Sequence, residues 1–321
     1  PGSLASVSQT TSSITLSWSA PVVTTGSAVT GYKLYIDDGS SGDPSAEVSC
    51  GGAALDTTCT ASGLTGGVSY SFEVSALSTN GESVTSSVLT QSTAPAVVAA
   101  SGMVFSSVAM TSMVLTWSAP SGETPTGYIV YRDDGDSTAM PTPSIVAFEG
   151  DALTTTVDGL TGGPTYTYMV EALSGSGVGD VSGESAQSTT PASPLDLSSV
   201  SQTSTSISLS WSASVVSGGS AVTSYQVYRN DGSSAEASLS GTAAHTTADG
   251  STTTATLSGL SAGMLYSFAV SAVSDAGEGE LSSVLAQSSA PGAPASGQTS
   301  VHQTSASISL SWSAPASDGG S

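Results

Sequence analysis

Two cysteines, Cys50 and Cys59, lie close together in this chain of 321 residues. Their thiols could form a disulfide, bind a metal or remain reduced in a core. A metal site needs further ligands, and both histidines, His245 and His302, lie far along the chain. Disulfides persist in oxidising compartments, and one that closes so short a loop stabilises a fold by about 2–3 kcal/mol. We therefore predict a Cys50–Cys59 disulfide, with two buried free thiols as the alternative.

Acidic clusters recur at three places, Asp37–Gly39, Asp133–Asp136 and Asn230–Gly232. Carboxylates of this kind could hold Ca²⁺, and Asp133, Asp134 and Asp136 are the weak candidate ligands. The calcium-loop pattern of an EF-hand is absent, however. Asp-Gly and Asn-Gly tolerate the positive φ of tight hairpin turns. We predict turns at these places and expect no cofactor.

Enzymatic chemistry has no visible basis in the sequence. His245 and His302 have no counterparts elsewhere, and no nucleophile-elbow motif accompanies the many serines. No glycine-rich loop ends in Lys-Ser or Lys-Thr, so a phosphate-binding loop is not expected. The acidic residues are scattered, so paired catalytic carboxylates cannot be placed. We predict that the chain is not an enzyme.

The charge balance excludes two classes of partner. The formal net charge is −22, and Lys33, Arg132 and Arg229 are the only three cationic residues besides histidine. Nucleic-acid binding and binding to an anionic membrane surface both require many more cations. The chain also lacks a run of about 20 apolar residues, so no membrane span is expected. The acidic surface favours solubility.

The elements that carry these residues are repeated. A segment of six residues that alternates polar and apolar side chains and ends in tryptophan predicts a strand with one apolar face. A second strand pattern, Tyr-x-[Phe/Tyr]-x-Val-x-Ala, begins six residues after a Gly-Leu leucine. The first pattern occurs at Ser13–Trp18, Ser112–Trp117, Ser206–Trp211 and Ser307–Trp312, and the second begins at Tyr70, Tyr166 and Tyr266.

Short strands separated by Gly- and Ser-rich turns favour a two-sheet sandwich. With these motifs, the whole chain resembles the fibronectin type III family. The resemblance implies an all-β fold of tandem seven-stranded sandwiches in a rod. It also implies core positions for the tryptophans and tyrosine corners in which a hydroxyl binds the chain just upstream. The implied core residues are Trp18, Trp117, Trp211, Trp312, Tyr70, Tyr166 and Tyr266.

The corners depart from the family in one respect. The family often has Pro-Gly between the leucine and the tyrosine. This chain has Gly66-Gly67, Gly162-Gly163 and Ala262-Gly263 instead.

Proline-containing junctions divide the chain into four predicted segments. Repeats 1, 2 and 3 are expected at 1–94, 95–190 and 191–290, and 291–321 would hold the first two strands of repeat 4. Two strands cannot bury Ile308, Leu310 and Trp312 unaided. We expect the chain to continue, with completion by a neighbouring molecule as the alternative.

The first functional hypothesis is structural. Tandem sandwiches without a polar cluster suit a segment of a long extracellular or cell-surface filament, including a flagellar one, or of a matrix fibre. Its partners would be copies of itself or other filament and matrix proteins. The alternative is spacer or binding modules of a larger adhesin or secreted carbohydrate-active enzyme, because fold alone does not decide function.

The abundance of Ser and Thr suggests O-linked glycans. The candidate neighbourhoods are Thr124-Pro125, Thr142-Pro143 and Thr190-Pro191. No Asn-x-Ser/Thr sequon is present.

Overall fold

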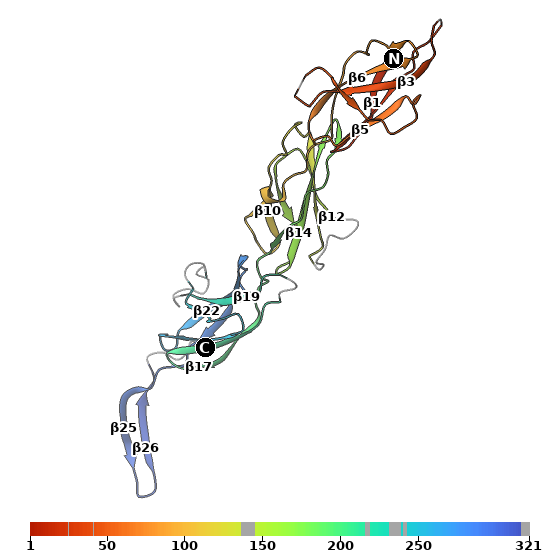
Figure 1. The fold of residues 1–321 in the computed structure, drawn as a ribbon. Coiled ribbons are helices and arrows are strands. Elements are labelled where there is room, and N and C mark those ends of the chain that lie inside the picture. Colours follow the sequence, from red (N-terminus) through yellow and green to blue (C-terminus); the bar gives the residue numbers. More distant parts are fainter. Residues whose placement is uncertain are drawn as a thin grey trace. The chain divides into compact units, whose positions relative to one another are not determined.

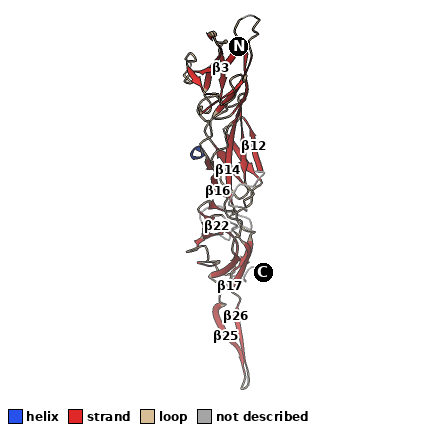
Figure 2. Cartoon of the chain, turned by 45° about the vertical axis from the view of Figure 1, so that its right-hand side comes forward, coloured by secondary structure: helices blue, strands red, loops and turns tan. Residues whose placement is uncertain are grey.

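The computed structural model describes residues 1–24, 26–40, 42–135, 145–215, 219–230, 239 and 243–315 (Figure 1). Strands dominate these residues, and one short 3-10 helix, η1 (Ala100–Gly102), occurs among them (Figure 2). The predicted all-β fold of tandem sandwiches is confirmed. None of the described residues forms a helix long and apolar enough to cross a membrane.

The chain divides into two compact units whose boundary crosses the second repeat. One unit comprises Pro1–Ser106, Val114–Val157 and Thr167–Ala186. The other comprises Ser107–Met113, Asp158–Tyr166 and Gln187–Ser321.

Repeat 1 contains strands β1 to β8 in two sheets. The smaller sheet has the order β1-β2-β5, and the larger has the order β4-β3-β6-β7 with β8 also paired to β6. All the pairs for which a register is described are antiparallel. The bounds are β1 Gly2–Gln9, β2 Ser13–Ser19, β3 Val29–Ile36, β4 Ala46–Val48, β5 Thr58–Ser62, β6 Ser69–Ser78, β7 Gly81–Glu82 and β8 Leu89–Ser92.

Repeats 2 and 3 use the same plan. Their smaller sheets have the orders β13-β10-β9 and β17-β18-β21, and their larger sheets β12-β11-β14-β15 and β20-β19-β22-β23. β16 pairs with β14, and β24 with β22. In repeat 2 the bounds are β9 Val104–Ser106, β10 Ser112–Thr116, β11 Gly127–Arg132, β12 Ile145–Gly150, β13 Thr154–Asp158, β14 Thr165–Ser174, β15 Gly177–Val178 and β16 Ser185–Ser188. In repeat 3 they are β17 Leu195–Gln202, β18 Ser206–Ser212, β19 Val222–Arg229, β20 His245–Thr246, β21 Thr254–Ser258, β22 Leu265–Ser274, β23 Gly277–Glu278 and β24 Leu285–Ser288.

The seventh strand of each sandwich is interrupted, which the strand pattern does not predict. In repeat 1, β7 and β8 both pair with β6. Between them, Ser86 donates its N–H to the Val74 carbonyl at 2.9 Å, and its Oγ accepts the Val74 N–H at 3.1 Å. The serine therefore satisfies both backbone groups of one residue without a continuous ladder. Ser182 and Ser282 make the same two bonds to Val170 and Val270.

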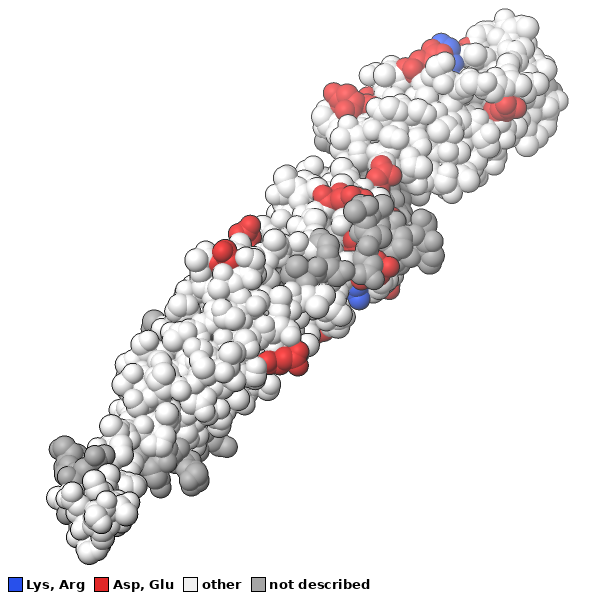
Figure 3. Space-filling model, turned by 90° about the horizontal axis from the view of Figure 1, so that it is seen from below, with Lys and Arg blue, Asp and Glu red and all other residues white. Residues whose placement is uncertain are grey.

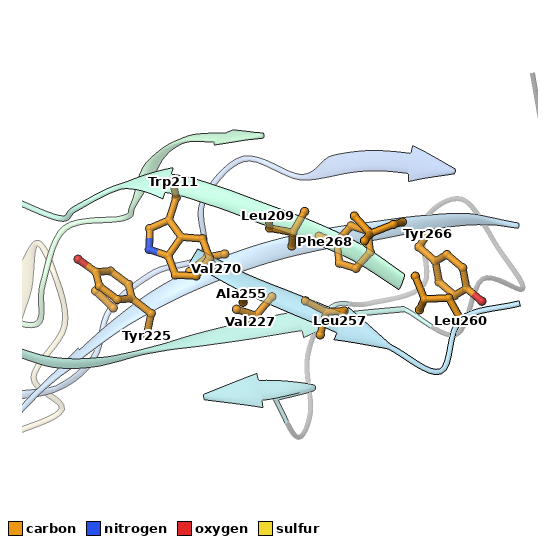
Figure 4. Close-up of a cluster of buried hydrophobic side chains, with 12 residues drawn as sticks. Leu209, Trp211, Tyr225, Val227, Ala255, Leu257, Leu260, Tyr266, Phe268 and Val270 are labelled. Atoms are coloured by element: carbon orange, nitrogen blue, oxygen red, sulfur yellow. The ribbon is translucent and has the colours of Figure 1, made fainter. Parts of the chain in front are cut away.

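The core of repeat 3 shows how the alternating strands build a sandwich (Figure 4). Leu209 and Trp211 of β18 face Val227 of β19 and Val270 of β22, and all four are buried. Their neighbours Ser208 and Ser210 point to the opposite face. Trp211 packs edge-on against Tyr225, with ring centroids 5.5 Å apart. Trp18 with Tyr32 and Trp117 with Tyr128 repeat this contact at 5.5 and 5.6 Å.

The last two strands, β25 (Ala295–Gln303) and β26 (Ile308–Ser313), form a separate two-stranded sheet. Ile308, Leu310 and Trp312 are 60%, 55% and 60% exposed. Trp312 thus differs from the core position implied by the family resemblance. The reason is that no second layer covers this sheet among the described residues.

The surface carries little charge of either sign. Figure 3 shows acidic side chains singly or in small groups on this face, with a few Lys or Arg atoms beside them. Lys33 forms an ion pair with Glu47 at 3.0 Å and lies 3.9 Å from Glu82.

Candidate functional site

The three predicted corner tyrosines are buried, and each hydroxyl binds the chain five residues upstream. Tyr70 Oη accepts the Thr65 N–H at 2.9 Å. Tyr166 and Tyr266 accept the Thr161 and Ser261 N–H groups at 3.0 and 2.9 Å. Each hydroxyl satisfies a backbone donor that burial would otherwise leave without a partner. Each corner therefore fixes the segment just before the tyrosine strand to that strand.

A second hydroxyl at each corner was missed from the sequence. The side chain of Thr93 donates to the Thr65 carbonyl at 2.8 Å. Thr189 and Ser289 donate to the equivalent carbonyls of Thr161 and Ser261 at 2.7 and 2.6 Å. The available signal was a Ser or Thr two residues before the proline of every junction.

Cys50 and Cys59 form the predicted disulfide. Cys50 follows β4 of the larger sheet, whereas Cys59 lies in β5 of the smaller sheet. The bond therefore joins the two layers of one sandwich. The positions equivalent to Cys59 in the other repeats hold Thr155 and Ala255, so this link belongs to repeat 1.

Two of the acidic clusters have turn geometry. Asp37 Oδ1 accepts the Gly39 N–H at 3.1 Å, and Asp133 Oδ1 accepts the Gly135 N–H at 3.1 Å. Gly39 and Gly135 have φ values of 80° and 82°, which favour glycine.

Of the candidate calcium ligands, Asp133 is buried and Asp134 is exposed, whereas Asp136 lies outside the described residues. Asp231 and Gly232 of the third cluster also lie outside them. No group of three or more His, Cys, Asp or Glu side chains that could hold a metal occurs in the part of the chain that the structure describes.

A tyrosine–carboxylate pair recurs on the outer face of the larger sheets, and the sequence analysis did not identify it. Tyr35 Oη and Ser75 Oγ both donate to Glu82 Oε1 at 2.5 Å. In repeat 3, Tyr228 and Ser271 donate in the same way to Glu278.

Repeat 2 makes this pair with a carboxylate from another strand. Tyr131 donates to Glu171 Oε2 at 2.8 Å. Glu171 occupies the position of Ser75, and Val178 occupies the position of Glu82. The tyrosine–carboxylate contact is thus retained although the acid has moved from the seventh strand to the sixth.

These contacts move the side-chain pKa values away from neutrality. Hydrogen bonds from Ser75 and Tyr35 lower the pKa of Glu82. Burial, followed by the hydrogen bond to a carboxylate, raises the pKa of Tyr131 and of Tyr228 to about 12. General acid–base catalysis is most effective when the pKa lies near the working pH. This arrangement therefore favours a structural role.

The remaining chemically distinctive residues are dispersed. His245 is in β20 and His302 is in β25, which belong to different sheets. A cavity beside the disulfide, lined by Trp18, Tyr32 and Asp56 among others, measures about 70 Å³. Small-molecule sites typically measure about 300–1,000 Å³, so this cavity is smaller than a typical ligand site.

The candidate O-glycosylation neighbourhoods differ in access. Thr124 is exposed, whereas Thr190 is buried with 3% exposure. The Thr190 side chain is therefore inaccessible in the folded chain, and O-glycosylation of these neighbourhoods stays a prediction. Thr142 and Pro143 lie outside the described residues.

Comparison with known proteins gives a consistent result. The family model of the fibronectin type III domain matches residues 1–92, 98–189 and 192–288. Exoglucanase B of Cellulomonas fimi is 32% identical over 95% of the chain and 26% of its own length. Chitinase A1 of Niallia circulans is 35% identical over 53% of the chain, and Endoglucanase B of Cellulomonas fimi 32% identical over 84%. Those matches cover 22% and 25% of the two enzymes, so the chain spans about a quarter of these relatives.

Proposed function

The chain belongs to the fibronectin type III family, and we propose that it is a set of spacer modules within a larger secreted carbohydrate-active enzyme. One observation carries the proposal. Similar segments make up about a quarter of proteins named as an exoglucanase, a chitinase and an endoglucanase. The chain would therefore separate other domains without performing their chemistry.

The geometry supports a non-catalytic role. The tyrosine hydroxyls of the corners are engaged with backbone groups. The carboxylates of Glu82 and Glu278 accept hydrogen bonds from neighbouring side chains. These hydrogen bonds lower the pKa of Glu82, and burial together with the bond to Glu278 raises that of Tyr228 to about 12, whereas general acid–base catalysis works best with a pKa near the working pH.

An extracellular location is part of the proposal. The disulfide between Cys50 and Cys59 is stable in an oxidising environment. The comparisons support the spacer alternative, whereas they lend no support to the filament hypothesis.

The test compares the native protein with the 321-residue chain produced alone. Both are incubated with cellulose and chitin, and the release of soluble sugar is measured. We expect release by the native protein and none by the isolated chain. Native material that forms repeat-only filaments in electron microscopy and releases no sugar would contradict the proposal.

A further inference from the structure

The corner of repeat 1 is hydrogen-bonded to a turn of repeat 2. The Gly67 carbonyl accepts the N–H of Glu123 at 2.5 Å. Glu123 lies between β10 and β11, in the turn that follows the second strand of its repeat. Both residues belong to the same compact unit. A backbone bond therefore crosses from one repeat to the next at this corner.

The two backbones meet at glycines on both sides. A Cβ on Gly122 would lie 2.7 Å from the carbonyl carbon of Gly67 and closer still to its oxygen. A Cβ on Gly67 would lie 2.8 Å from the Ser121 carbonyl oxygen. Real Cβ atoms essentially never come within 3.0 Å of such atoms. A side chain at either position would therefore hold the turn away from the corner.

Side-chain hydrogen bonds hold this turn in place within repeat 2. The Glu123 carboxylate accepts the hydroxyls of Ser174 and Ser176, both at 3.2 Å. These serines lie at the end of β14 and in the turn after it. Glu123 therefore presents its N–H to the corner of repeat 1 while its carboxylate is bound to its own repeat.

A second polar contact crosses the same joint. Thr11 Oγ1 donates to Asp180 Oδ2 at 2.5 Å, and both residues lie in the same compact unit. Thr11 belongs to repeat 1 and precedes β2, whereas Asp180 follows β15 of repeat 2. This contact and the bond between Glu123 and Gly67 thus connect the two repeats at two places.

The joint between repeats 2 and 3 has the same glycine contact. The pattern Gly-x-x-x-Thr-x-Tyr places Gly219 at the position of Gly122. A Cβ on Gly219 would lie 2.6 Å from the carbonyl carbon of Gly163, the corner glycine of repeat 2, and closer still to its oxygen. Ser220 follows, and its hydroxyl donates to that of Ser188 in β16 at 3.2 Å. These four residues of the second joint lie within the other compact unit.

Repeat 1 has the same glycine without the contact. Gly26 begins its copy of the pattern and has a φ of 108°, close to the 97° of Gly122. Both values favour glycine. Among the described residues, none lies within 4 Å of a Cβ built on Gly26. The backbone conformation therefore accounts for Gly26, whereas Gly122 is also constrained by the repeat before it.

We propose that a repeat carries a docking surface for the corner of the repeat before it. In repeat 2 this surface comprises Gly122, Glu123 and Asp180, and in repeat 3 it comprises Gly219 and Ser220. Docking keeps each joint closed and so maintains the spacing of the repeats, which a flexible tether would not do. The inference goes beyond the proposed function and does not depend on it, because the contacts join repeats of this chain to one another.

The test is amide hydrogen exchange of the full chain, resolved by residue with NMR, because exchange measures how often a segment opens. We expect the Glu123 N–H to exchange at least about tenfold more slowly than that of Ser27, its equivalent in repeat 1. Gly122→Ala should remove most of this protection, because the added methyl group forces the turn off the corner. Gly26→Ala is the matched control. It places alanine at a similar positive φ without a neighbour, and should change Glu123 exchange by less than about twofold.

Asp180→Ala tests the same surface without straining the backbone. It removes the acceptor of the Thr11 hydroxyl and should speed exchange of the Glu123 N–H about threefold, because the two contacts close one joint. The Asp133 N–H is bonded to the Thr167 carbonyl within repeat 2, so its protection reports that this repeat is folded. If Gly122→Ala unfolds repeat 2, that protection is lost as well, and Asp180→Ala alone decides.

Three results would overturn the proposal. The first is a Glu123 N–H that exchanges as fast as that of Ser27 in the original chain. The second is an equal effect of Gly122→Ala and Gly26→Ala on Glu123 exchange. The third is unchanged Glu123 exchange in Asp180→Ala. Sugar release plays no part in these measurements, so failure of the spacer function is detected separately.

Discussion

The same six residues, Ser-Ile-Ser-Leu-Ser-Trp, occur at Ser206–Trp211 and Ser307–Trp312. The two copies differ in the burial of their apolar side chains. In the first copy Leu209 is 0% exposed, whereas in the second Leu310 is 55% exposed. Both copies are antiparallel strands paired with the strand before them. The pairing therefore does not explain the difference in burial.

The pairing is in fact nearly identical in the two regions. Leu209 lies opposite Ser199, and Leu310 lies opposite Ser300, with register shifts on either side of these pairs. The alternation of the six residues thus encodes a strand, its apolar face and its local register. Burial of that face depends on a second sheet, which β19 and β22 supply in repeat 3.

The largest expected effect separates the two tryptophans. Trp211→Ala should reduce the free energy of unfolding of repeat 3 by about 3–5 kcal/mol, because it leaves a cavity between two sheets. Trp312→Ala should change the stability of repeat 3 by less than about 0.5 kcal/mol, because that side chain is exposed. Calorimetric unfolding of the full chain measures both.

Equal losses from the two substitutions would contradict this comparison. Fluorescence gives an independent check, because an aqueous quencher should reach Trp312 and should not reach Trp211. Trp18 and Trp117 are buried as well and serve as matched controls.

The comparison also defines what can be read from the sequence. The repeated motifs, through their resemblance to the fibronectin type III family, predicted the fold and the corner tyrosines. The two neighbouring cysteines predicted the disulfide. These features depend on local periodicity or on residues that lie close together in the chain. Trp312 carries the same local signal as Trp211, and burial of either side chain requires the strands of a second layer.

Contacts between distant residues were not predictable. Tyr131 and Glu171 meet only because β11 and β14 pair, and the equivalent acid in repeat 1 is on β7. Ser182 interrupts a strand by its hydrogen bond to Val170. Nothing in the sequence distinguishes this serine from the others. In a chain this rich in serine, the composition does not indicate which hydroxyls bind distant residues.

The second prediction concerns how the two sheets are joined. Repeat 1 joins its sheets covalently through Cys50 and Cys59, whereas repeats 2 and 3 rely on packing. Replacing both cysteines by alanine should destabilise repeat 1 by about 2–3 kcal/mol, because the unfolded chain gains freedom. Calorimetry should show a lower unfolding temperature for repeat 1 alone. A shift of all three transitions would show that the bond acts beyond its own sandwich.

The third prediction tests the corner within repeat 3. Tyr266→Phe retains the ring in the core and removes the acceptor of the Ser261 N–H. We expect a loss of about 1–2 kcal/mol, because a buried donor is left without a partner. Tyr35→Phe is the control, because its hydroxyl binds a carboxylate on the outer face. A greater loss from Tyr35→Phe than from Tyr266→Phe would show that the outer-face hydroxyl stabilises its repeat more than the corner hydroxyl does.

The smallest expected effect concerns that outer face. The pKa of Tyr228 is raised from 10.0 to about 12, first by burial and then by its hydrogen bond to Glu278. An unfolded tyrosine ionises at lower pH, so the stabilisation is complete below pH 10 and is lost as the pH rises toward about 12.

Glu278→Gln removes the charged acceptor and should lower the pKa of Tyr228, while burial still holds it above 10.0. The tyrosinate absorbance of the variant, compared with the original chain, measures this shift. Tyr131 is the matched control, because its partner Glu171 is unchanged and its pKa of about 12 should not move. An unaltered pKa for Tyr228 would mean that burial alone sets it, and that the recurring carboxylate orients the ring without affecting its ionisation.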